Sequence, residues 1–295
     1  MNKHAYLIIA NKNQKQLQKL INTIDDSRND IYLLIDKKSI RNFTQKFWVQ
    51  YSDLNILKPI NIFWGNYSQI QAELNLFDAA HYGHYEYYHL LSGSDLPLTN
   101  QDEIHNFFDN HPNKEFITYS AINDANQLSI RLHNYRFTKN FRSSNKLYNL
   151  VHKCEFRYFK NKPEKRVILS DIAFGSQWVS LEDNLVNDLL RNNDQIFYLF
   201  HNGYLVDELM IPIFINLHTK YKKKIFFKEP VHDKPEEFQG NLRYINWWDG
   251  SPYVWRLKDY PLLRKAYNNG HLFSRKFDET IDNDIIDKIV KKVLE

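Results

Sequence analysis

The chain has 295 residues, of which 43% are hydrophobic and 15% aromatic, a composition that excludes disorder and supplies the core of one large α/β domain. The net charge of +4 is too small for a typical nucleic-acid-binding protein, but it would suit a nucleotide or an anionic membrane surface. The single cysteine, Cys154, excludes an internal disulfide, and the first apolar run, residues 5–10, is too short for a signal peptide or a membrane span. We therefore expect a cytoplasmic protein, with the inner face of the membrane as the alternative location.

Buried strands and amphipathic helices alternate along the first 111 residues. The predicted order is strand 5–10, helix 13–24, strand 30–36, strand 61–65, helix 68–83, strand 85–93 and helix 100–111. Ser68 and Asn100 are the expected N-caps of the last two helices. This alternation predicts an α/β fold with a Rossmann-like, mostly parallel central sheet flanked by helices.

The second half of the chain has a less regular pattern. It predicts strands at 114–120, 171–181 and 242–248, and helices at 182–193, 204–219 and 282–295. The last helix is amphipathic, and we expect it to pack on its own domain and not on a membrane. Asp282 and Asp284 form the only Asp-x-Asp of the chain, which we interpret as a cap of this helix and not as a metal site.

Polar residues follow three of the predicted strands, at 11–13, 36–39 and 92–95. The carboxyl ends of parallel strands lie at one edge of a sheet, where ligands of such sheets bind. These residues offer a carboxylate for a ribose or a base, lysines for phosphate, and small side chains that admit a ligand close to the backbone. The alternative is that they are ordinary polar loops.

Six segments, in this order, resemble the core-2/I-branching family of glycosyltransferases. They are AYLIIANKN with QLQKLINTI and DIYLLIDKKS, then WGNYSQIQAELNLFDAA, YYHLLSGSDLPLTNQDEI, FGSQWVSL, DELMIPIF and HLFSRKFD. The resemblance implies a GT-A fold in a single domain, with a nucleotide-binding half at 1–120 and an acceptor-binding half at 121–295. It also implies an inverting enzyme that uses UDP-sugars. The missing membrane anchor makes the chain look like a bacterial member.

The resemblance assigns the catalytic base and the groups that bind the diphosphate. Glu208 matches the catalytic glutamate of the family, and its place in the first turn of a predicted helix would allow burial to raise its pKa. Asp207 is the second candidate, and the alternative for both is stabilisation of the helix dipole. Lys276, with Arg275 beside it, matches the lysine that replaces the metal ion. An assisting arginine is expected upstream, with Arg243 and Arg256 as candidates.

The remaining sites follow from the same motifs. The resemblance and the strand ends place the nucleotide at Asn11, Lys12, Asp36, Trp64 and Gly65, and the donor sugar at Ser94 and Asp95. The acceptor is expected at Gln177, Trp178, Tyr244 and Trp247, because aromatic faces stack on sugar rings.

Neither a metal ion nor another cofactor is expected. Ser92 stands where a second acid would complete a chelating pair with Asp95, so that pair is absent from the sequence. His81, His84 and His89 lack a nearby fourth ligand for zinc, and we interpret them as helix-end and strand residues.

The sequence thus predicts a metal-independent transferase that moves N-acetylglucosamine from UDP to a hydroxyl and forms a β linkage, in bacterial polysaccharide or glycoprotein glycan synthesis. The acceptor would be a glycan, a lipid-linked oligosaccharide or a glycoprotein. Peripheral association with a membrane stays open, and no nucleic-acid partner is expected. The alternatives are UDP-glucose, UDP-galactose or UDP-xylose as donor, or an inactive module that binds nucleotide-sugars or glycans.

Overall fold

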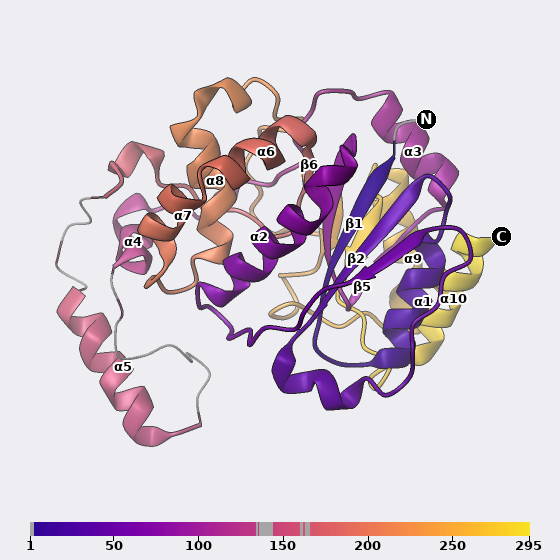
Figure 1. The fold of residues 1–295 in the computed structure, drawn as a ribbon, viewed down its shortest axis with the longest axis horizontal. Helices are drawn as coiled ribbons and strands as arrows, with labels where there is room; N and C mark the ends of the chain where they lie inside the picture. The colour runs from indigo at the N-terminus through magenta and orange to yellow at the C-terminus, as the bar shows by residue number, and fades with distance from the viewer. Residues whose placement is uncertain (1–2, 134, 136–143, 160–161, 163–165) are drawn as a thin grey trace.

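A mostly parallel sheet forms the centre of the molecule (Figure 1). The computed structural model describes residues 3–133, 135, 144–159, 162 and 166–295. Within these residues the sheet has the strand order β3 (Asp53–Ile56), β2 (Asn29–Ile35), β1 (His4–Ala10), β4 (Tyr87–Ser92) and β6 (Ser180–Glu182). The first four strands pair in parallel, and β6 joins β4 in the antiparallel direction. The predicted α/β class with a mainly parallel sheet is confirmed.

Helices cover both faces of this sheet. Successive residues of a strand point to opposite faces, so Ala5 and Leu7 of β1 enter one core while Tyr6 and Ile8 enter the other. The helices of the first core are α2 (Ser68–Ala80), α6 (Asp183–Arg191), α7 (Asn193–Phe200) and α8 (Asp207–Leu217). Those of the second core are α1 (Gln14–Ile24), α3 (Gln101–Asp109), α9 (Tyr260–Asn268) and α10 (Asn283–Leu294). The short helix α4 (Ala125–Ser129) adds Leu128 to the first core, and α5 (Lys146–Phe159) lies beside this group (Figure 1).

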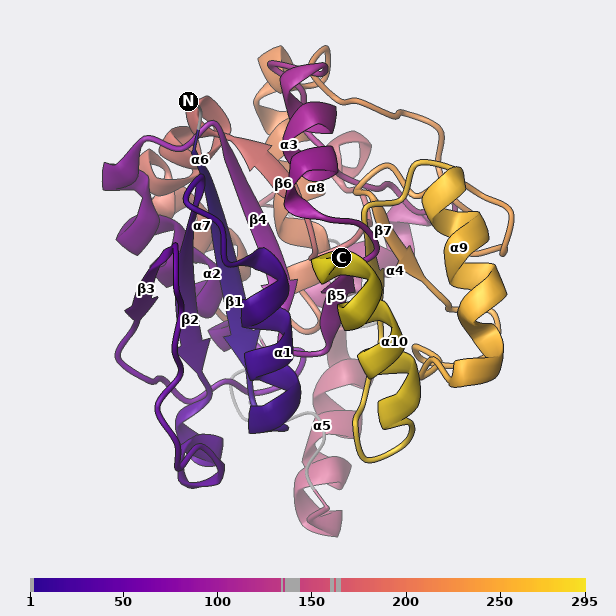
Figure 2. The ribbon, with the colours of Figure 1, turned by 90° about the vertical axis from the view of Figure 1, so that its right-hand side faces the viewer.

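The C-terminal helix α10 packs on the domain, as the sequence predicts. Ile285, Ile286 and Ile289 are buried in the second core, next to α1 (Figure 2). The side chain of Asp282 accepts a hydrogen bond from the Ile285 amide and caps the helix. Among the described residues, no helix has the length and apolar character needed to cross a bilayer.

A second, smaller sheet joins distant parts of the chain. Its strands are β5 (Asp95–Pro97), β8 (Phe273–Arg275) and β7 (Arg243–Ile245), in that order across the sheet. β5 and β8 are antiparallel and place Asp95 opposite Arg275. The segment that follows β4 therefore lies beside the basic pair near the C-terminus. The sequence predicts neither β5 nor β8 as a strand.

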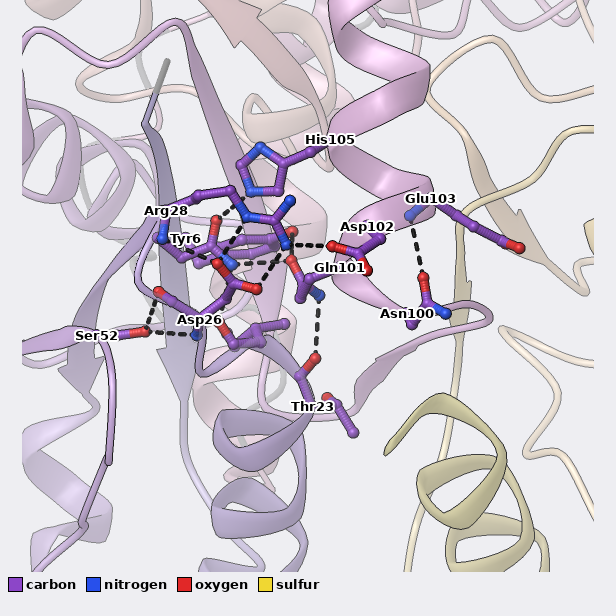
Figure 3. A network of polar contacts seen from close by, with 12 residues as sticks. Tyr6, Thr23, Asp26, Arg28, Ser52, Asn100, Gln101, Asp102, Glu103 and His105 are labelled. Atoms are coloured by element: carbon purple, nitrogen blue, oxygen red, sulfur yellow. Dashed lines mark hydrogen bonds and ion pairs between the residues drawn. The ribbon is translucent and has the colours of Figure 1, made fainter. Parts of the chain in front are cut away.

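A hydrogen-bonded network closes the amino-terminal edge of the central sheet (Figure 3). The Gln101 side chain donates to the Thr23 carbonyl at 3.0 Å and accepts from the Tyr6 hydroxyl at 2.9 Å and the Asn29 amide at 2.8 Å. Arg28 beside them forms ion pairs with the carboxylates of Asp26 and Asp102. His105 belongs to the same network. The network fixes the starts of β1 and β2 against α3.

Several predicted element boundaries are wrong. The third strand lies at β3, not at 61–65, because the chain turns at Trp64 and Gly65, and the φ of 73° at Gly65 is incompatible with a strand. Segment 114–120 forms isolated bridges instead of a strand, and segment 171–181 is irregular apart from a bridge at Gly175 and β6 at its end. Ser68 is the first residue of α2, where its hydroxyl accepts a hydrogen bond from the Phe63 amide instead of capping the helix. The prediction for Asn100 is confirmed, because its side chain accepts from the Glu103 amide at 3.0 Å.

Candidate active site

A cavity of about 560 Å³ opens at the carboxyl ends of β1, β2 and β4. Eleven of the residues predicted for the site line it together: Asn11, Lys12, Asp36, Trp64, Ser94, Gln177, Trp178, Glu208, Trp247, Arg275 and Lys276. The expectation that the polar strand ends meet at one edge of the sheet is therefore met. Segments from both halves of the sequence contribute to one site.

The strand ends form one wall of the cavity. Gly93 lines it between Ser92 and Ser94, and a Cβ atom at Gly93 would lie 3.2 Å from the Cβ of Ala10 in β1. A side chain at Gly93 would therefore require its neighbours to move by a few tenths of an ångström. The buried carboxylate of Asp36, after β2, accepts hydrogen bonds from the backbone amides of Lys38 and Ile62, at 3.1 and 3.2 Å. Asp36 is thus held in a fixed orientation at the cavity.

The basic wall comes from the end of β8. Arg275 donates a hydrogen bond to the buried Asp95 carboxylate at 2.9 Å and also to the hydroxyl of Ser92. Its guanidinium lies 4.5 Å from the ring centre of Trp178, in a cation–π contact. The next residue, Lys276, lines the same cavity. The contacts of Arg275 fix its guanidinium, and Lys276 places a second cationic side chain at the same side of the site.

Lys12 adds a third cationic side chain to the cavity and, like Arg275, already has an anionic partner. Its Nζ forms an ion pair with Asp278, which also accepts from Asn13 at 2.9 Å. Burial opposes ionisation of Asp278, yet these hydrogen bonds and that from Thr280 lower its pKa well below the usual range. Asp278 therefore stays ionised and neutralises Lys12.

The acidic wall is the first turn of α8. Glu208 accepts a hydrogen bond from Arg131 at 3.2 Å, and its side chain is 30% exposed. Asp207 is buried and accepts from the Gln69 side chain at 3.0 Å, while its Oδ1 atom has no hydrogen-bond partner among the described residues. Removal from bulk water raises the pKa of both carboxyls, and the charge of Asp207 raises that of Glu208 further, against the opposing effect of Arg131.

A third carboxyl lies behind the cavity wall. Glu73, on α2, is fully buried and accepts a hydrogen bond from the side chain of Gln177 at 2.8 Å. Its Oε2 atom has no partner within the described part of the chain. Burial, and then the charge of Asp207, raise the pKa of Glu73 well above its ordinary value. A protonated Glu73 thus holds the amide that lines the cavity.

Four of the residues predicted for the site do not line the cavity. Arg243 is fully buried, where its guanidinium donates to the Ser180 hydroxyl at 2.7 Å and to backbone carbonyls, so it cannot reach a diphosphate. Tyr244 is buried too, and its hydroxyl donates to a carbonyl outside the cavity. Asp95 is buried beneath the cavity with Arg275 and Ser92, so it holds Arg275 and does not contact the donor. Gly65 shapes the turn, but only its neighbour Trp64 lines the cavity.

Several lining residues were not predicted from the sequence. They are Gln69, Thr118, Phe174, Asp233, Gln239 and Asn241, among others. Most of them lie in irregular segments that long-range contacts bring together; the Asn241 amide, for example, donates to the Thr118 hydroxyl at 2.9 Å. Their place could not be found from local patterns.

The three histidines lie at a helix end and in a strand. His81 and His84 lie at the end of α2, and His89 is buried in β4, where its ring contacts Ser180 and His4. Across the residues with a described position, no group of three or more histidine, cysteine or acidic side chains could hold a metal ion. Cys154 is exposed on α5.

Comparisons with known proteins identify the family of the chain. A protein-family model described as "Core-2/I-Branching enzyme" matches residues 4–260. A search of curated proteins found no match. Among solved structures, the apo form of mouse xyloside xylosyltransferase 1 is similar, at 13% identity and a TM-score of 0.37, over 93% of this chain and 97% of that one. The identity and TM-score are too low for any residue to be compared.

Proposed function

Because the chain belongs to the core-2/I-branching enzyme family, we propose that it is an inverting glycosyltransferase that moves N-acetylglucosamine from a UDP-sugar to a glycan hydroxyl without a metal ion. Family membership makes the chain a glycosyltransferase, with a nucleotide-sugar donor and a glycan acceptor. The sugar, the stereochemistry and the independence of metal are our proposals. One observation carries the proposed mechanism: Glu208 and the basic pair of Arg275 and Lys276 line one cavity.

The proposed step is a single displacement at the anomeric carbon of the donor. The acceptor hydroxyl oxygen forms the new bond, and its proton moves to the carboxylate of Glu208. The bond to the diphosphate breaks with its electron pair on the UDP oxygen, and Lys276 and Arg275 stabilise that charge. Attack from the face opposite the leaving group converts an α-linked donor into a β-linked product. The raised pKa of Glu208 suits a base that works near neutral pH.

The surroundings of Asp95 support the metal-free part of the proposal. Both of its oxygens are engaged, because Ser92 donates from its amide at 3.0 Å and its hydroxyl at 2.6 Å, while Arg275 donates at 2.9 Å. A guanidinium therefore stands where a metal ion would have to bind this carboxylate. A metal ion at this place would need a second acid as a ligand, whereas Arg275 is held by Asp95 and Ser92.

Different residues of the same cavity are proposed to bind the donor nucleotide and the acceptor sugar. We assign the uracil and ribose to Asp36 and Asn11 at the strand ends, with Trp64 at the border. Trp247 is the stronger candidate for stacking on an acceptor sugar, because it is 38% exposed, whereas Arg275 covers Trp178. Residues 1–120 and 121–295 would thus form the nucleotide and acceptor halves of one domain. By analogy with bacterial members of the family, we place the reaction in cytoplasmic synthesis of polysaccharide or glycoprotein glycans.

The test is UDP release from UDP-N-acetylglucosamine, UDP-glucose, UDP-galactose and UDP-xylose, each with a panel of glycan acceptors and with EDTA. We expect turnover of UDP-N-acetylglucosamine at an unchanged rate when EDTA is present. Turnover of another donor alone would contradict the assigned sugar. Activity lost in EDTA and restored by Mn²⁺ would contradict the metal-free mechanism. UDP binding without any turnover would support an inactive binding module instead.

A further inference from the structure

Helix α5 carries an apolar stripe that faces solvent. Leu147, Leu150, Cys154 and Tyr158 follow one another at spacings of three, four and four residues, which places them on one side of a helix. All four are exposed; the exposed fractions are 68% for Leu147, 58% for Leu150 and 62% for Tyr158. Isolated exposed apolar residues are common, but a continuous stripe of this kind marks an interaction surface.

The orientation of this stripe is set by the opposite side of the helix. The ring of His152 lies 5.2 Å from that of Tyr204, and the ring of Phe159 lies 5.0 Å from that of His133. Glu155, on the same side, is buried. Since this face packs against the domain, the leucine face must point away from it.

Basic side chains run beside the apolar stripe. Lys146, Lys153 and Arg157 are exposed and lie along one edge of it, again at helical spacing. The Nζ of Lys162 lies 3.5 Å from the ring centre of Tyr158, at the end of the stripe. The only acidic residue of the helix, Glu155, is on the packed side. The exposed surface of α5 is thus apolar and cationic, without a carboxylate to offset the charge.

This surface lies on the cavity side of the molecule. In Figure 2, α5 extends beyond the body in the direction in which the arrows of β1 and β2 point, that is, at the carboxyl ends of the strands. The chain also links the two places directly. The amide of Tyr204, which contacts α5, donates to the carbonyl of Arg131 at 2.7 Å, and Arg131 binds Glu208.

We propose that the outer face of α5, formed by its leucine stripe and its basic edge, docks the protein on an anionic lipid bilayer. An amphipathic helix with apolar residues on one side and Lys or Arg beside them is the chemistry that binds such interfaces. The basic residues would lie at the lipid headgroups while the leucines enter the acyl boundary. The inference concerns binding alone and goes beyond the proposed function. If that function also holds, a lipid-linked acceptor in the same bilayer would reach the side of the protein that carries Glu208.

Vesicle flotation tests the proposal, with vesicles of phosphatidylcholine alone or mixed with phosphatidylglycerol. The protein should float with the mixed vesicles only, and less as salt is added. Each basic residue near such a surface contributes about fivefold in affinity, so the triple variant K146Q/K153Q/R157Q should bind about 100-fold more weakly. Cys154 is the only cysteine of the chain and lies in the stripe, so an environment-sensitive dye on it should shift to shorter emission wavelengths on mixed vesicles.

The matched control is K288Q/K291Q/K292Q, which removes the same charge from exposed positions of α10, at the far end of the molecule from α5 (Figure 1). It should bind within about twofold of the unmodified protein. The proposal is overturned if the unmodified protein does not float, if both triple variants lose binding equally, or if the dye stays in a water-like environment while the protein floats. A dimer that L147S/L150S abolishes, without vesicle binding, would instead make this face a contact between two copies.

Thermal unfolding of each variant checks that it is folded. Vesicle binding requires no turnover, so this inference and the proposed function fail separately. A protein that floats but releases no UDP would contradict only the function. An active protein that does not float would contradict only the inference.

Discussion

The two edges of the central sheet use their buried polar groups differently. At the amino edge, the Gln101 carboxamide uses both of its ends, and Arg28 is paired with two carboxylates. At the carboxyl edge, the described structure leaves one oxygen of Asp207 and one of Glu73 without a hydrogen bond. An unpaired buried polar atom costs about 1–3 kcal/mol of stability. Among the described residues, the amino edge also has an unpaired atom, Nε2 of His4, but that atom lies in the packed core, whereas Asp207 lines a cavity that a ligand can enter. The difference is thus that the network around Gln101 holds the fold, while the unpaired oxygen of Asp207 lies where a ligand can bind.

The stability of the two edges also depends on pH in opposite directions. Burial lowers the pKa of His4 and His105, to about 4 for His105, so their neutral forms are favoured in the fold. Burial raises the pKa of Glu73 and Glu208, so the folded state holds protons that the unfolded chain releases. Acid should therefore weaken the amino edge, and alkali should weaken the cavity.

The largest predicted effect is on turnover at the carboxyl edge. Glu208→Gln removes the proposed base but keeps the size of the side chain, and turnover should fall about 1000-fold. The thermal unfolding temperature should change little, because the side chain is only partly buried and its carboxamide oxygen can still accept the hydrogen bond from Arg131. UDP release measures the effect, and Glu229→Gln, at an exposed position, is the control. Normal turnover of Glu208→Gln would remove Glu208 from the mechanism.

The next effect is on stability at the amino edge. Gln101→Leu leaves the Tyr6 hydroxyl, the Asn29 amide and the Thr23 carbonyl without this partner, and the free energy of unfolding should fall by about 3 kcal/mol. Denaturant unfolding measures the loss, with the exposed Gln127→Leu as control. Turnover of the folded fraction should be unchanged. If Gln101→Leu lowers turnover without a loss of stability, the proposed separation of the two edges is wrong.

The third effect concerns acid. The pKa of His105 in the fold, about 4, lies below the ordinary value of 6.5, so the unfolded chain binds its proton first. Its contribution to stability is complete above about pH 6.5 and is lost towards pH 4, by up to about 1.4 kcal/mol per pH unit. The free energy of unfolding of His105→Asn should depend less steeply on pH in that window. Equal slopes for both proteins would show that His105 does not titrate in this way.

The smallest effect has the opposite sign and lies at the cavity. Since burial raises the pKa of Glu73 above its ordinary value, stability should be lost as the pH rises above that value. Glu73→Gln removes this loss, so the variant should gain stability relative to the unmodified protein as the pH rises above that value. The gain per pH unit should be below the limit of about 1.4 kcal/mol, because the nearby Asp207 titrates as well. If Glu73→Gln and the unmodified protein lose the same stability as the pH rises, Glu73 is not protonated in the fold.

Local sequence patterns and the family resemblance predict the sheet class and much of the cavity. Asn11, Asp36 and Ser94 follow strands, and Glu208 begins a helix, so strand ends and helix starts place them correctly. Lys276 is found through its motif. The errors at Asp95 and Arg243 have one cause: β5, β7 and β8 form a small sheet from segments up to about 180 residues apart, and this pairing buries both side chains. No local pattern contains that information.

The central claim is that one cavity separates two tasks, proton transfer at Glu208 and charge balance for the diphosphate at Lys276. Calorimetric titration with UDP of the unmodified protein, Glu208→Gln and Lys276→Met tests it most directly. The account predicts an unchanged affinity for Glu208→Gln and an affinity at least about tenfold lower for Lys276→Met, because a charge-assisted contact is worth about 1.5 kcal/mol or more. Equal affinities in all three proteins, or the same loss in both variants, would contradict it.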